Sequence, residues 1–180
     1  QSVKKGVKQS GGTPREFCTI TVTDGIAMGH EGMKSSLISR EVIADSAELT
    51  VRGHCYDALV GIAGCDKSLP GLMMSMLRLN VPSVFIYGGS ILPGKFKGKD
   101  VTVVDVFEAV GKHSSGKMSS EELRELELVA CPSAGACGGQ FTANTMACVS
   151  EAIGLALPYS AGTPAPYEER DKYAYESGQA

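Results

Sequence analysis

Two short segments carry the side chains of this chain that are best suited to chemistry. One contains Cys65, Asp66 and Lys67 directly after an apolar run, and the other places Cys137 among glycines. A thiolate is a soft ligand that suits iron or zinc, whereas a carboxylate is a hard ligand that suits magnesium or manganese. Two unlike metal preferences at neighbouring positions indicate a site that performs a reaction.

Asp24 is a further candidate because of its place in the chain. It follows residues 17–23, a β-branched, alternating run that predicts a strand, and residues 57–63 predict a buried strand before Cys65. Ligands of open parallel sheets bind beyond the carboxyl ends of the strands, so both segments are expected at one rim. Successive side chains of an extended segment point in opposite directions, so Cys65 and Asp66 can face two neighbouring centres.

Each of these residues also has a simpler interpretation. Asp24 before a glycine is typical of a turn, and Cys65 can be a small buried hydrophobe. Asp66 and Lys67 can form a surface ion pair worth about 0–1 kcal/mol. The joint placement of these residues after predicted strands favours the ligand interpretation.

Cys137 lies in a glycine-rich turn before a predicted helix, with glycine at 135, 138 and 139. Glycine allows the backbone to approach a bulky group closely, and the first amides of a helix favour a nearby anion. An anionic cluster or a substrate carboxylate would each fit there. The alternative is a turn that leads into the helix and contains an incidental thiol.

The remaining motifs are weaker. Residues 89–95 have the spacing of a phosphate-binding loop, but Phe96 stands where a serine or threonine would bind Mg²⁺. No Cys-x-x-Cys motif occurs, which argues against a zinc ribbon. Cys148 is expected in the core, and His30 is more typical of a solvated loop than of a substrate contact.

The bulk composition is that of a globular protein that binds neither nucleic acid nor a membrane. The chain has 180 residues, 43% of them hydrophobic, and a net charge of −3 without a basic stripe or a long apolar run. The six cysteines occur without a signal-peptide pattern, so we expect reduced thiols and a cytoplasmic protein. Both ends resemble cut ends, so an internal piece of a longer protein is expected.

Strands that alternate with helices predict an α/β fold with a mostly parallel sheet flanked by helices in α/β/α layers. A further strand is predicted at residues 83–87, and residues 93–99 are expected to form a loop. Helices are predicted at residues 34–53, 70–79, 106–111, 120–130 and 140–157, with Ser119 and Glu122 as a capping box for the fourth of these.

Several long motifs resemble signatures of the dihydroxyacid dehydratase family, which also includes sugar-acid dehydratases. The motifs occur in the family's order and span nearly the whole chain, at residues 23–33, 39–46, 64–71, 87–89 and 135–146. The resemblance covers the middle of the family's first domain. It therefore implies that residues 1–180 form a partial N-terminal iron–sulfur and Mg²⁺-binding domain without the C-terminal domain.

The resemblance also implies cofactors and ligands. An iron–sulfur cluster, usually [2Fe–2S], would be bound by Cys65, Cys137 and a third cysteine just upstream of Gln1. Mg²⁺ would be held by Asp24, Asp66 and a carbamylated Lys67, with a glutamate from the C-terminal domain. The base would be a serine of that same domain, so no catalytic base is assigned within this chain.

The reaction implied by the resemblance is the elimination of water from a 2,3-dihydroxy carboxylate to give a 2-oxo acid. The substrate expected is 2,3-dihydroxy-3-methylbutanoate of branched-chain amino-acid synthesis, a choice favoured by residues 104–108, and a homodimer is expected. Two alternatives stay open: a sugar-acid dehydratase acting on gluconate or arabinonate, and an α/β module that is inactive as residues 1–180 alone.

Overall fold

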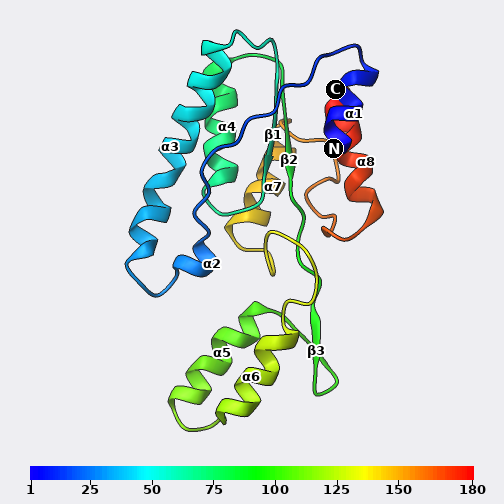
Figure 1. The fold of residues 1–180 in the computed structure, drawn as a ribbon. Coiled ribbons are helices and arrows are strands. Elements are labelled where there is room, and N and C mark those ends of the chain that lie inside the picture. The colour runs from blue at the N-terminus through cyan, green and yellow to red at the C-terminus, as the bar shows by residue number, and fades with distance from the viewer.

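A computed structural model describes all residues of the chain, Gln1–Ala180, as eight helices and four short strands (Figure 1). The strands are β1 (Leu59–Ala63), β2 (Ser83–Tyr87), β3 (Gly94–Phe96) and β4 (Lys99–Val101). The helices are α1 (Ser2–Gln9), α2 (Asp24–Ala27), α3 (Gly32–Gly53), α4 (Ser68–Leu79), α5 (Val103–Ser114), α6 (Ser120–Val129), α7 (Thr142–Ala152) and α8 (Glu168–Gln179).

Strands β1 and β2 form a parallel pair joined by helix α4. Leu59 lies opposite Ser83 at one end of the pair, and Ala63 lies opposite Tyr87 at the other. Parallel strands need a crossover connection, which α4 supplies. The carboxyl ends of both strands therefore meet at one edge.

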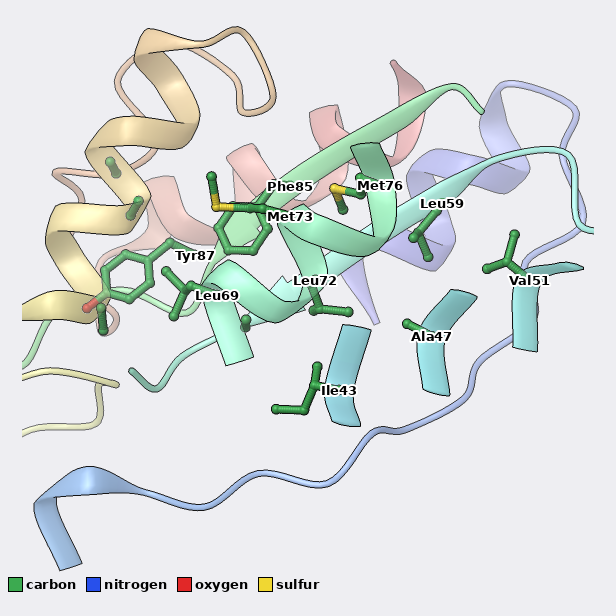
Figure 2. Close-up of a cluster of buried hydrophobic side chains, with 14 residues drawn as sticks. Ile43, Ala47, Val51, Leu59, Leu69, Leu72, Met73, Met76, Phe85 and Tyr87 are labelled. Atoms are coloured by element: carbon green, nitrogen blue, oxygen red, sulfur yellow. The ribbon is translucent and has the colours of Figure 1, made fainter. Parts of the chain in front are cut away.

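The main core lies between these strands and helices α3, α4 and α7. Small side chains let α3 and α4 approach closely, since a methyl group added at Gly71 would meet the carbonyl oxygen of Arg40 at 2.8 Å. Figure 2 shows the side chains of α3 facing α4, with those of β2 beyond α4. The largest members of this core are Ile43, Val51, Leu59, Leu69, Leu72, Met73, Met76, Phe85 and Tyr87.

A smaller unit consists of the β3–β4 hairpin and helices α5 and α6. It has its own core of Val101, Ala109, Leu126 and Ala130, and Figure 1 shows it projecting from the main body. Residues 93–99, predicted as a loop, instead form most of this hairpin, because Gly94 pairs with Val101 and Phe96 with Lys99.

Helices α1 and α8 bring the two ends of the chain together, as the N and C labels in Figure 1 show. The helices run parallel, because Ser2 donates to Asp171 at 2.9 Å and Ser10 donates to the carbonyl oxygen of Gln179 at 3.1 Å. Glycine permits the close packing, since a Cβ at Gly6 would overlap the carbonyl oxygen of Tyr175.

The predicted α/β class is confirmed, because helices flank a parallel strand pair that is accompanied by an antiparallel pair. The predicted strand at residues 83–87 and the helix at 34–53 are confirmed within two residues. Ser119 accepts a hydrogen bond from the amide of Glu122 at 3.1 Å, as expected of the cap of α6. No helix is long and apolar enough to span a bilayer.

One predicted strand is absent, one predicted helix is shorter than expected, and one is longer. Residues 17–23 are not a strand, because no neighbouring strand pairs with them. The helix expected at 140–157 ends at Ala152, because Leu155 instead accepts a hydrogen bond from Phe85 of β2 at 2.7 Å. The helix expected at 106–111 is the longer α5, whose first turn is closed by a reciprocal capping box of Thr102 and Asp105.

Candidate functional site

The candidate site lies at the carboxyl ends of β1 and β2, where the chain leaves the sheet. Gly64 follows β1, and the backbone after β2 binds the segment that carries Cys137. The amide of Ala136 donates to the carbonyl oxygen of Gly89 at 2.8 Å, and the amide of Ile91 donates to that of Cys137 at 2.9 Å. A Cβ at Gly64 would meet the Cβ of Ala136 at 2.9 Å, so the two cysteine segments lie against each other.

Two carboxylates and one amine form the charged part of the site. The Lys67 Nζ lies 3.6 Å from Asp24 Oδ2 and also bonds the carboxylate of Asp66. All three side chains are mostly buried, with 14–19% of each exposed. Asp24 lies more than forty residues before Asp66 and Lys67 in the sequence, and the fold brings the three side chains together.

Opposing effects set the protonation of this cluster. Burial would raise the pKa of Asp66, but hydrogen bonds from Lys67 and Thr142 and the charge of Lys67 outweigh burial and hold that pKa below its ordinary value. Burial would lower the pKa of Lys67, but its bonds to the two aspartates raise it instead. The structure therefore favours an Asp66 carboxylate beside a Lys67 ammonium.

Two hydroxyl groups from distant elements act on the carboxylates. Ser36 of α3 is fully buried and donates to Asp24. The Thr142 side chain at the start of α7 helps to lower the pKa of Asp66. The sequence pattern does not single out Ser36 or Thr142 as a partner of these carboxylates. Both assignments depend on the packing of α3 and α7 around the site.

Cys65 is tied to the segment that carries Asp24. Its Sγ donates to the Thr23 hydroxyl at 3.0 Å, and its amide donates to the Ser68 hydroxyl at 3.2 Å. An open cavity of about 340 Å³ lies against this thiol. It is lined by three threonines from the extended segment and by the loops at the sheet edge: Thr19, Thr21, Thr23, Ile62, Ala63, Gly64, Cys65, Ser68, Gly135 and Ala136.

Other candidates from the sequence lie apart from this site. His30 makes local bonds in its own loop, to the carbonyl oxygen of Ile26 at 2.7 Å and from the amide of Gly32 at 3.0 Å. Cys148, expected in the core, is exposed, because the buried face of α7 is formed by Ala143, Ala147 and Ser150.

The donor set can be compared with the chemistry of metals. The structure contains no group of three or more His, Cys, Asp and Glu side chains that could hold a metal ion alone. Asp24 and Asp66 fit Mg²⁺, which commonly takes one or two carboxylates and fills its other positions with water or substrate. Cys65 and Cys137 are half-buried thiols without disulfides, which fits a soft metal that takes further ligands from elsewhere.

An α/β domain with acidic and thiol side chains at the carboxyl edge of a parallel strand pair has the make-up of an enzyme domain. Comparison with known sequences identifies the family of this domain. The model of the dihydroxy-acid/6-phosphogluconate dehydratase N-terminal domain matches residues 1–180, and the chain belongs to this family.

Individual relatives agree with the family. The chain is 92% identical over 179 residues to the dihydroxy-acid dehydratase of Pelagibacter ubique and 84% identical over 180 residues to that of Parvibaculum lavamentivorans. It is 58% identical over 179 residues to the dihydroxy-acid dehydratase of Metallosphaera sedula. These alignments cover 99–100% of this chain, which spans about a third of the length of those relatives (31–32%).

Proposed function

We propose that the protein containing this domain dehydrates 2,3-dihydroxy carboxylic acids to 2-oxo acids in the synthesis of valine and isoleucine. The substrate proposed is 2,3-dihydroxy-3-methylbutanoate. The observation that carries the proposal is the meeting of Asp24, Asp66 and Lys67 beside Cys65 at one sheet edge. The name shared by relatives up to 92% identical supports this substrate class.

In this proposal the acidic cluster and the thiols hold separate groups. Asp24 and Asp66, with Lys67 after its carbamylation, would hold Mg²⁺, and Cys65 and Cys137 would hold a [2Fe–2S] cluster. When bound, the metals supply Lewis-acid assistance to the elimination. The overall reaction removes the C2 proton and the 3-hydroxyl group as water, and the resulting enol becomes the 2-oxo acid.

The residues of this chain orient these groups and shape the substrate space. Ser36 holds one oxygen of Asp24 and so favours one orientation of that carboxylate, and Thr142 favours the charged form of Asp66. The threonines of the extended segment line the cavity beside Cys65 and would give hydroxyl partners to a polar substrate. The base, the remaining ligands and the second subunit of a cytoplasmic homodimer are proposed to come from outside residues 1–180.

Assays of the intact protein test the substrate. We expect turnover of 2,3-dihydroxy-3-methylbutanoate, and turnover of gluconate or arabinonate alone would contradict the proposal. The family model also covers 6-phosphogluconate dehydratases, so 6-phosphogluconate belongs in the same assay. Residues 1–180 alone are expected to be inactive.

A matched pair of variants tests the acidic cluster. In the intact protein, D66N should lose at least about 100-fold in kcat, because Mg²⁺ would lose a charged ligand. D57N changes an exposed aspartate just before β1, at the end away from the site, and should keep full activity. Equal activity of the two variants would remove Asp66 from the mechanism.

A further inference from the structure

The hydroxyl group of Tyr87 is buried without a partner. Tyr87 is 1% exposed, and its hydroxyl makes no hydrogen bond within the chain. Buried polar groups normally have a partner, because removal from water without compensation costs free energy. The feature needs an explanation, since phenylalanine would fill the same core space without that cost.

Tyr87 lies near the segments that carry the two candidate thiols, Cys65 and Cys137. Tyr87 is the last residue of β2 and lies opposite Ala63, two residues before Cys65. Cys137 packs against the core cluster that contains Tyr87. Figure 2 shows the ring of Tyr87 at the end of that cluster nearest α7, away from Met76 and Leu59.

Local electrostatics keep this hydroxyl protonated. Burial raises the pKa of Tyr87 most strongly, and nearby Cys137 raises it further, while Arg170 has the opposite and smaller effect. A protonated phenol can donate a hydrogen bond.

The known neighbour of Tyr87 does not use the hydroxyl. The Arg170 guanidinium lies over the ring at 5.8 Å from its centroid and donates to the backbone carbonyl oxygen of Tyr87 at 2.8 Å. These contacts involve the ring and the backbone of Tyr87, and none of them uses its hydroxyl group.

We propose that the Tyr87 hydroxyl donates a hydrogen bond to a sulfur atom of the iron–sulfur group held by Cys65 and Cys137. The inference rests on the proposed function and assigns Tyr87 as a positioning residue that acts through the cluster. A donor to a sulfur stabilises the more negative, reduced form, so it raises the reduction potential.

The test measures the midpoint potential of the intact, cluster-loaded protein. Tyr87→Phe removes only the donor, so we expect the potential to become more negative. Replacement of Tyr87 by 3-fluorotyrosine makes the phenol a stronger donor, so the potential should become more positive. The 3-fluorotyrosine variant keeps the ring and the hydroxyl group. It therefore still tests the hydrogen bond if the phenylalanine variant fails to hold iron.

Tyr56 supplies the matched control. It borders the same core but precedes β1, at the end of the strand away from Cys65. The same two replacements at Tyr56 should leave the potential unchanged.

The outcomes separate this inference from the proposed function. Opposite shifts at Tyr87, absent at Tyr56, support the hydrogen bond. Unchanged potentials at Tyr87 in a protein that carries iron and sulfide overturn the role of Tyr87 and leave the cluster assignment intact. A wild-type protein without iron and sulfide overturns both.

Discussion

Lys67 is the residue whose chemical state decides what the acidic cluster can bind. As an ammonium held by Asp24 and Asp66, it occupies the position that a divalent ion would need and repels that ion. Its neutral amine can instead attack CO₂, which forms a carbamate and releases a proton. That reaction replaces a cation by an oxygen ligand, so metal binding and CO₂ uptake at this residue should be coupled.

The raised pKa of Lys67 predicts the conditions for carbamate formation. Only the neutral amine reacts, and it is scarce below the raised pKa, so carbamate should increase as pH rises. With ¹³C-labelled CO₂, the carbamate signal in NMR should be weak without Mg²⁺ and strong with it. K67M should lack the signal, and a signal of equal strength without Mg²⁺ would contradict the coupling.

Ser36 should contribute to metal affinity although it touches no metal in this proposal. S36A leaves Asp24 free to rotate, so Mg²⁺ affinity of the intact protein should fall about 10-fold, as is typical when a partner of a ligand is lost. Titration calorimetry measures the change. S35A alters the exposed neighbour and should bind like the wild type; equal affinity of both variants would mean that Ser36 does not position Asp24.

At the scale of single residues, the sequence could predict the side chains suited to chemistry but not the groups that position them. Cys65 and Lys67 follow the strand β1, as the sheet-edge argument predicts. Asp24 follows residues 17–23, which are not a strand, so that argument does not account for its place beside them. The supporting groups Thr142 and Tyr87 could not be found, because their roles depend on contacts between elements far apart in the sequence.

At the scale of elements, the close contact of α3 with α4 depends on a single missing side chain. In G71A the new methyl group would lie 2.8 Å from the carbonyl oxygen of Arg40 and 2.9 Å from Ile43 Cγ2. Overpacking of this kind costs about 1–3 kcal/mol, so the free energy of unfolding should fall by that amount in urea titrations.

Gly53 provides the control for that experiment. It ends α3 with no atom within 4 Å of an added Cβ, so G53A should change stability by less than about 0.5 kcal/mol. Equal losses in both variants would point to a general cost of the substitution and contradict a steric conflict at Gly71.

Elements with strong local patterns were predictable, and those decided by distant partners were not. The helical period of the α3 sequence and the apolar run of β2 each predict the element from local residues alone. Residues 17–23 have the composition of a strand, but strands exist only by pairing, and no partner lies beside them. Leu155 has the pattern of a helix, yet its carbonyl oxygen binds Phe85 of the sheet.

At the scale of the whole molecule, Arg170 joins the last helix to the site. Its guanidinium is buried and donates to the carbonyl oxygens of Tyr87, Ser160 and Thr163, without a carboxylate partner. These three carbonyl groups thus receive hydrogen bonds from one side chain near the start of α8.

Removal of Arg170 should therefore destabilise the fold. R170M keeps much of the apolar stem but leaves three carbonyl groups without this donor, and the expected loss is about 3 kcal/mol. R124M, at an exposed position of α6, should lose less than about 0.5 kcal/mol. Urea unfolding compares the two, and a similar midpoint for both would show that Arg170 is dispensable.

The parallel pairing of α1 with α8 has a mechanical consequence. The chain begins beside Asp171 and ends beside Ser10, so opposing tension on the two ends would slide one helix along the other. Contacts loaded in shear must fail together, whereas contacts peeled apart fail one at a time. A molecule tethered by its ends should thus yield abruptly at high force in an optical trap, with the glycine-packed helix pair as the clamp.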